Sequence, residues 1–292
     1  MMTGLGLVVK NHKVWGLVVL LVICSGLFRK SFFNLSIPSQ NQTGLRLVTH
    51  NIGSSLSGNV KPRWSYYKSL NADVLCFQEW NSGSSVYKTI KDSLERQYGH
   101  TTKRHNNLWP IFSKYPILDQ GELKSSALGN GCTWADIRYG HDTIRIYNVH
   151  LVSNRISTQT EQLMQTKEIP GKNTWQKITR VMRRYKHALL HRANQADVIK
   201  EHMVGSPYAV VLVGDFNDIP SSYVYNLLNK KMSDAFLMAG NGLAYTYAGR
   251  LPFLHIDQVL LSSDLKCTSY TIDRVHYSDH FPVMTCILSK GK

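Results

Sequence analysis

The sequence has 292 residues, 43% of them hydrophobic, which is ordinary for a globular protein and enough for one large α/β domain. Its five cysteines follow neither a CxxC nor a Cys/His spacing, which argues against a disulfide framework and a standard zinc motif. The formal charge of +15 favours polyanionic partners such as nucleic acid or an anionic membrane face, although a plain basic surface accounts for it equally simply.

The N-terminus carries an uncharged apolar run at residues 14–28, with two lysines before it and Arg29 and Lys30 after it. A membrane-spanning helix needs about 20 apolar residues, and basic flanks that reach the interface extend a shorter run. We therefore interpret residues 1–30 as a single-pass membrane anchor that places the following domain outside the cytoplasm. A signal segment that is cleaved, so that the protein is secreted, is the alternative. Residues 31–43 carry no charge and are interpreted as a tether.

Several strand-like runs in the body of the chain end or begin on polar residues. Apolar and β-branched runs of this length predict buried strands. The predicted strands at 45–51, 73–79 and 144–151 end on Asn51, Glu79 and His150, and the strand at 208–213 is followed by Asp215 and Asn217. Two more runs begin just after Asp257 and just after the pair Asp279 and His280. Open α/β sheets place their sites just past the carboxyl ends of strands, which is where Asp215 and Asn217 are expected to lie.

A long insert occupies residues 152–207. Its apolar residues between 174 and 203 recur at helical spacing, which predicts one long amphipathic helix with Thr174 as its N-cap. The opposite face carries a basic stripe, namely Lys177, Arg180, Arg183, Arg184, His187 and His191. A solvated helix face explains such a stripe, and a surface that binds polyanions or membranes is the alternative. Residues 155–173 are interpreted as a mobile loop that covers the site as a lid.

Six short strings follow one another along the chain: THN at 49–51, QE at 78–79, NxHL at 148–151, GDFN at 214–217, ID at 256–257 and SDH at 278–280. With these motifs the chain from about residue 44 to residue 290 resembles the endonuclease/exonuclease/phosphatase superfamily, whose members hydrolyse phosphate esters with a divalent metal. The string WPIFSKYPI at 109–117 is similar to the strand and turn between the superfamily's Glu and His motifs. One such motif is weak evidence, whereas six in order are specific.

The resemblance implies a fold and a set of site residues. The fold is a four-layer α/β/β/α sandwich with two central mixed sheets, formed by residues 44–292. The cofactor is Mg²⁺ or Mn²⁺, ions that prefer hard oxygen ligands, with Asn51, Glu79 and Asp279 at the metal site. The catalytic residues it implies are His150, Asp215, Asn217, Asp257 and His280.

Each catalytic residue receives an expected role from the same resemblance. Asp215 orients or deprotonates the attacking water, and Asn217 donates to a phosphate oxygen. His280 contacts the phosphate while Asp257 orients its ring. His150 stabilises the transition state or the leaving group.

The resemblance leaves the substrate open, because superfamily members cut DNA or RNA, remove phosphates from inositol lipids or hydrolyse sphingomyelin on the same core. Discrimination is expected in the loop at 245–255, where Tyr247 and Arg250 are suited to stack bases or receive a lipid headgroup. Aromatic packing at the domain edge is the alternative for this loop. We therefore predict a metal-dependent phosphodiesterase, with a membrane-tethered nuclease as one form of it. A membrane-lipid phosphoesterase and a catalytically silent polyanion-binding module are the alternatives.

Overall fold

The computed structural model describes residues 31–36, 43–53, 61–81, 83, 85–103, 108–123, 130–153, 172–249 and 253–290. The predicted anchor at residues 1–30 lies outside these ranges, as does nearly all of the predicted lid. Within the described ranges, no helix combines the length and the apolar character needed to cross a membrane.

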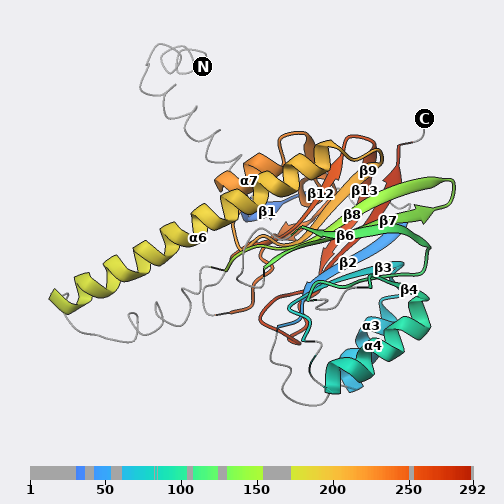
Figure 1. The fold of residues 1–292 in the computed structure, drawn as a ribbon, viewed down its shortest axis with the longest axis horizontal. Coiled ribbons are helices and arrows are strands. Elements are labelled where there is room, and N and C mark those ends of the chain that lie inside the picture. The colour runs from blue at the N-terminus through green and yellow to red at the C-terminus, as the bar shows by residue number, and fades with distance from the viewer. Residues whose placement is uncertain are drawn as a thin grey trace, which may run out of the picture.

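Two six-stranded sheets form the centre of the molecule (Figure 1). The first has the strand order β13 (Leu265–Ile272), β14 (Val283–Ser289), β2 (Leu45–Asn51), β3 (Val74–Gln78), β5 (Ile111–Ser113) and β4 (His100–Thr101). The second has the order β10 (Met232–Asp234), β12 (Asp257–Ser262), β9 (Ala209–Asp215), β8 (Asp142–His150), β7 (Gly131–Tyr139) and β6 (Ile117–Leu123). Each sheet is mixed, because β2 and β3 run parallel in the first and β8 and β9 run parallel in the second, while the other neighbours are antiparallel.

Helices cover the outer face of each sheet. Figure 1 shows α3 (Lys61–Ser69) and α4 (Ser85–Tyr98) on one side of the pair of sheets and α6 (Lys172–Val204) and α7 (Tyr223–Leu228) on the other. The short helix α8 (Ala235–Ala239) follows β10. A β-ribbon of β1 (Phe33–Asn34) and β11 (Gly242–Leu243) completes the described elements.

Three hydrophobic cores separate the layers. The inner faces of the two sheets share one core, to which Val74 and Ile146 belong. A second core joins α6 and α7 to the second sheet, and a third joins α3 and α4 to the first sheet. Each core is buried apolar surface, which supplies most of the free energy that holds sheets and helices together. The three cores confirm an α/β fold with two mixed sheets arranged in four layers.

The strand register brings the predicted site residues to one edge of the sandwich. In the second sheet, Asp215 at the end of β9 is paired with His150 on one side and with Asp257 on the other. In the first sheet, Asn51 at the end of β2 is paired with Gln78, which directly precedes Glu79. Because β2 also lies against β9 across the inner core, the two sets of strand ends meet.

The helix predicted at 174–203 is confirmed as α6, which spans Lys172–Val204. Thr174 lies inside its first turn and is therefore not the N-cap. Residues 33–34, within the predicted tether, belong to the fold, because β1 pairs with β11 and the fully buried Asn34 side chain donates to the carbonyls of Phe236 and Gly240.

Candidate active site

Asp215 lies at the centre of the cluster and is 1% exposed. Its Oδ1 accepts the backbone N–H of Asn217 at 2.7 Å, and its Oδ2 accepts the side-chain amides of Asn51 at 3.0 Å and Asn217 at 3.1 Å. Burial raises the pKa of Asp215 to about 7, although the charge of His280 lowers it. The strand reaches this position through Gly214, where a Cβ would lie 2.1 Å from the carbonyl oxygen of Val149, so the close approach requires glycine.

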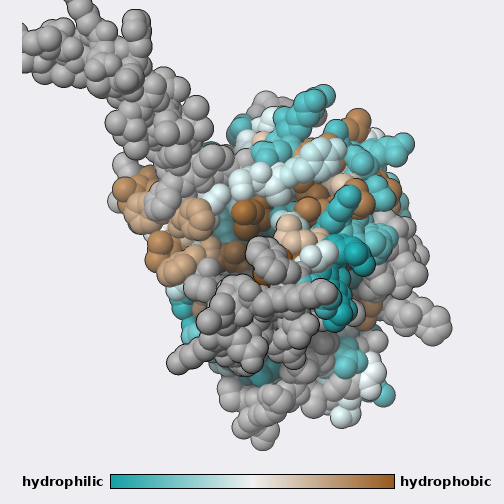
Figure 2. All heavy atoms as spheres, turned by 90° about the vertical axis from the view of Figure 1, so that its left-hand side faces the viewer, coloured by the Kyte–Doolittle hydropathy of each residue, from teal (hydrophilic) through white to brown (hydrophobic). Residues whose placement is uncertain are grey.

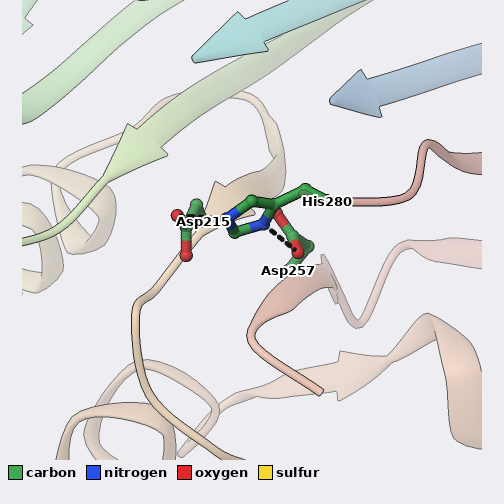
Figure 3. A group of neighbouring side chains, drawn as sticks. All are labelled: Asp215, Asp257 and His280. Atoms are coloured by element: carbon green, nitrogen blue, oxygen red, sulfur yellow. Dashed lines mark hydrogen bonds and ion pairs between the residues drawn. The ribbon is translucent and has the colours of Figure 1, made fainter. Parts of the chain in front are cut away.

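His280 and Asp257 form a buried pair beside Asp215 (Figure 3). The Nδ1 of His280 is 2.8 Å from the Oδ2 of Asp257, and its Nε2 is 3.7 Å from the Oδ2 of Asp215. Burial alone lowers the pKa of His280, but the negative charges of Asp257 and Asp215 outweigh it and raise the pKa to about 10. The imidazole is therefore a cation that donates to Asp257 and presents its second N–H to Asp215.

Glu79 joins the cluster from the first sheet. Its Oε1 accepts a hydrogen bond from the side-chain amide of Asn51 at 3.2 Å. The same oxygen lies 3.6 Å from Nε2 of His150, and this nitrogen lies 3.8 Å from Oδ2 of Asp215. The Glu79 side chain is 33% exposed while that of Asp215 is 1% exposed, so Glu79 faces the open side of the site. The single amide of Asn51 thus bridges carboxylates from the two sheets.

The contacts of His150 fix which of its nitrogens carries the proton. Burial lowers the pKa of His150 to about 4, so the ring is neutral at pH 7. The amide nitrogen of Asn130 lies 3.1 Å from the Leu151 carbonyl, which only accepts, so this amide is the donor and also donates to Nδ1 of His150 at 3.3 Å. The proton is therefore on Nε2, which points toward Glu79 and Asp215 and is buried without a hydrogen-bond partner in the described part of the chain.

Comparison with known proteins agrees with this geometry. Residues 48–280 match the model of the endonuclease/exonuclease/phosphatase family. The chain belongs to this family. A comparison of the sequence with curated proteins found no significant match.

Solved structures share the fold at low sequence identity. An endonuclease/exonuclease/phosphatase from Bacteroides vulgatus is 18% identical with a TM-score of 0.59, over 85% of this chain and 100% of the other. A mannosyl-6-phosphatase from Bacteroides thetaiotaomicron is 14% identical with a TM-score of 0.56, over 84% and 99%. Sphingomyelinase C from Streptomyces griseocarneus is 14% identical with a TM-score of 0.54, over 83% and 99%. At these identities the likeness extends to the fold alone.

The residues of this family site fit a divalent cation. Glu79 and Asp215 bring two carboxylates to one amide, and such neighbouring negative charges repel unless a cation neutralises them. Carboxylate and amide oxygens are the ligands that Mg²⁺ and Mn²⁺ prefer. Asp215, Asp257 and His280 also have ligand atoms within 4.8 Å of one another, but these three side chains are buried, and Nδ1 of His280 and Oδ2 of Asp257 already bind each other at 2.8 Å. Glu79 with Asn51 is therefore the better candidate for the metal site.

Three predicted site residues remain, namely Asp279, Tyr247 and Arg250. Asp279 is exposed, and its charge raises the pKa of His280 less than the charges of Asp257 and Asp215 do. Tyr247 packs its ring edge-on against the ring of His280, with centroids 5.1 Å apart, and the backbones of the two residues form a β-bridge. Arg250 lies outside the described residues. The structure thus brings Tyr247 to the site and leaves the metal role of Asp279 a prediction.

His50 supports the site and was not identified from the sequence. It is fully buried, with Nδ1 2.6 Å from the hydroxyl of Tyr67 and Nε2 3.1 Å from the carbonyl oxygen of His280. The carbonyl only accepts, so Nε2 carries the proton and Nδ1 accepts from Tyr67. Strand alternation between Thr49 and Asn51 shows that His50 faces away from Asn51, but nothing in the sequence indicates its partners.

A second supporting group links α6 to the site. Arg192 is fully buried, donates from Nε to Asp218 at 3.2 Å and from Nη1 to the carbonyl of Val152 at 3.0 Å. Gln195, one turn further along, accepts the backbone N–H of Val152 at 3.0 Å. Val152 lies two residues after His150, and Asp218 directly follows Asn217. The charged Asp218 in the string GDFND is the only sequence signal for this contact.

Two site residues have unusual backbone conformations. Glu79 has φ of +56° and Asn217 has φ of +50°, both in the left-handed region that non-glycine residues seldom adopt. Each costs of order 1 kcal/mol and persists only where surrounding contacts hold it. Glu79 turns the chain directly after β3, and Asn217 turns it two residues after the end of β9; both side chains bind within the cluster.

Proposed function

We propose that this chain is a divalent-metal-dependent hydrolase of phosphate esters, and that the reaction takes place at the cluster around Asp215. The observation that carries the proposal is the convergence of Asp215 with His150, His280 and Glu79 from strand ends of two different sheets. Family membership supports a phosphoester as the substrate. A catalytically silent module is disfavoured, because a silent site has no need for buried charges that cost free energy.

Glu79 and Asn51 would hold the cation, with Asp279 as a further candidate ligand from the exposed side. Mg²⁺ or Mn²⁺ bound there would neutralise phosphate charge and make a bound water more acidic. The carboxylate of Glu79 would supply the negative charge that binds the ion, and the side-chain amide of Asn51 orients this carboxylate by donating a hydrogen bond to it.

Asp215 is suited to orient the attacking water and to take its proton. Its raised pKa of about 7 matches the requirement that a general base titrate near the working pH. Asn217 holds Asp215 through two hydrogen bonds, so the carboxylate cannot turn away. The Asn217 amide donates to Asp215 Oδ2 at 3.1 Å and to the Leu151 carbonyl at 2.9 Å, so the proposed donation to a phosphate oxygen requires it to exchange one of these two bonds.

His280 supplies positive charge where a phosphoryl group becomes more negative. Asp257 fixes its ring at 2.8 Å, and His50 holds its carbonyl, so the cation needs no reorganisation during the reaction. The neutral His150 presents Nε2–H as a donor on the other side of Asp215. In this proposal the N–H of His150 would stabilise a transition-state or leaving oxygen.

Two substrate classes, nucleic acid and phospholipid, are proposed for this reaction. Tyr247 against His280 supports a role for the 245–255 loop in substrate contact, with Arg250 as its proposed second member. A nuclease tethered by residues 14–28 and a lipid phosphoesterase both agree with this loop and with the basic charge. The proposed location is the membrane, with the domain extracytoplasmic, or secreted if residues 1–30 are cleaved.

The test is hydrolysis of bis-p-nitrophenyl phosphate by the full-length protein with Mg²⁺ or Mn²⁺ and then with EDTA. We expect activity that EDTA abolishes and that added metal restores. His280→Ala should remove it, whereas His141→Ala, at an exposed turn between β7 and β8, should not. Activity that survives EDTA, or equal loss in both variants, would contradict the proposal. A panel of plasmid DNA, RNA, sphingomyelin and phosphoinositides then separates the substrate classes.

A further inference from the structure

The first half of α6 is densely basic. Residues 172–191 contain six Lys or Arg residues and two His residues, and neither Asp nor Glu. The side chains of Arg180, Arg183, Arg184 and Lys186 are exposed. A helix with so many like charges repels itself in isolation, which suggests that it meets negative charge from outside.

The same half of α6 exposes an apolar stripe. Ile178 and Met182 are 37% and 59% exposed, and they are one turn apart on the same side of the helix. Further along, this side continues into Ala196 and Ile199, which are buried against the second sheet. The packing face of α6 therefore extends beyond the sheet that covers it.

The arrangement of α6 relative to the sheets also leaves its first half uncovered. Figure 1 shows the first half of α6 projecting away from the sheets, while its second half lies along them. Figure 2 views the molecule from the side toward which α6 projects and shows hydrophobic and hydrophilic residues side by side on that end. An exposed helix with one apolar face and one basic face has the composition of a helix that lies in a lipid interface.

We propose that residues 172–191 of α6 bind an anionic lipid surface, with the stripe of Ile178 and Met182 in the acyl boundary and the arginines at the headgroups. A second copy of this chain is disfavoured, because it would bring an equally basic helix to the interface. A nucleic acid would engage the arginines but leave the apolar stripe in water. Only a lipid surface satisfies both faces.

The contact would also orient the active site. Arg192 and Gln195 lie directly after this segment and bind Asp218 and Val152 beside the site. The bound helix would therefore hold the strand ends in a fixed direction relative to the bilayer. This inference does not depend on the proposed hydrolysis, because binding is measured without turnover.

The experiment places a fluorescent probe on each face of α6 in the full-length protein. In a Cys24→Ser background the remaining cysteines Cys76, Cys132, Cys267 and Cys286 are buried, so an environment-sensitive dye such as NBD labels an introduced cysteine selectively. The probe positions are Met182→Cys on the stripe and His187→Cys, about 140° around the helix. The protein is reconstituted into vesicles of phosphatidylcholine alone or with phosphatidylserine, so that any contribution of residues 14–28 is common to both.

We expect a blue shift at position 182 in the anionic vesicles, little shift at 187, and loss of the shift at about 1 M salt, where the Debye length is about 3 Å. Arg180→Gln, Arg183→Gln and Arg184→Gln together should abolish the shift, and circular dichroism checks that the helix persists. A water-like probe at 182 in anionic vesicles would overturn the proposal. So would a shift caused only by a DNA duplex, or one that rises with protein concentration in the absence of lipid.

Discussion

The buried pair of Arg192 and Asp218 provides the most quantitative prediction of stability. Both side chains lie almost wholly out of water, at 0% and 6% exposure, and Arg192 also holds the Val152 carbonyl. Removing one partner of a buried ion pair costs about 3–5 kcal/mol, because the other charge remains buried without compensation. Arg192→Met keeps most of the side-chain volume, so the loss of charge dominates over any cavity. We expect the free energy of unfolding to fall by about 3–5 kcal/mol.

Urea unfolding of the wild type, Arg192→Met, Asp218→Asn and the double variant measures this as a double-mutant cycle. The double variant should lose clearly less free energy of unfolding than the two single variants lose together, because it leaves no charge unpaired. The kcat of Arg192→Met should fall more than its KM rises, because Val152 lies two residues from His150. A loss below about 1 kcal/mol, or an additive double variant, would refute the argument that the pair anchors α6 to the site.

Three further predictions concern the site and its surroundings. Asp257→Asn should lower kcat by at least about tenfold with a smaller change in KM, because the neutral amide no longer holds His280 as a cation. Steady-state kinetics measures both constants, and an unchanged kcat would contradict this role of Asp257. Glu79→Gln should raise the Mn²⁺ concentration needed for half-maximal activity and weaken Mn²⁺ binding in calorimetry, and equal binding in the wild type and this variant would contradict its role as a ligand. Burial, together with the charge of Arg145, lowers the pKa of His202 in the folded state. As the pH falls below about 6.5, the unfolded state therefore takes up a proton at this histidine before the folded state does, and the protein loses stability. Urea midpoints at about pH 7.5 and pH 5 should therefore differ less in His202→Gln than in the wild type, and equal differences would show that this histidine does not contribute.

The sequence predicted the elements whose pattern is local. The strands that end on Asn51 and His150, and the strand directly before Glu79, are short apolar runs, and α6 shows the 3.6-residue period of an amphipathic helix. The resemblance added the order of the motifs, which implied that these ends converge. In the structure, the strand register and the distances between side chains bring these ends to Asp215.

Contacts between residues far apart in the chain were not predicted. His50 meets the carbonyl of His280, 230 positions later, and neither residue's neighbours indicate the pairing. Arg192 reads as one more basic residue of α6, yet it is buried because Asp218 lies opposite it. Burial of a charge depends on its partner, which only the tertiary structure supplies. The anchor at residues 14–28 remains a prediction.

The most direct test of the account is the turnover of a phosphodiester by Asp215→Asn, compared with Asp264→Asn, whose carboxylate lies in an exposed turn. Asparagine keeps the size of the side chain but cannot accept the proton of the attacking water. We predict that Asp215→Asn lowers kcat by at least about 10²-fold in saturating metal while KM changes little, and that Asp264→Asn retains wild-type turnover. Turnover by Asp215→Asn within about threefold of the wild type would contradict the assignment of Asp215 as the centre of the site.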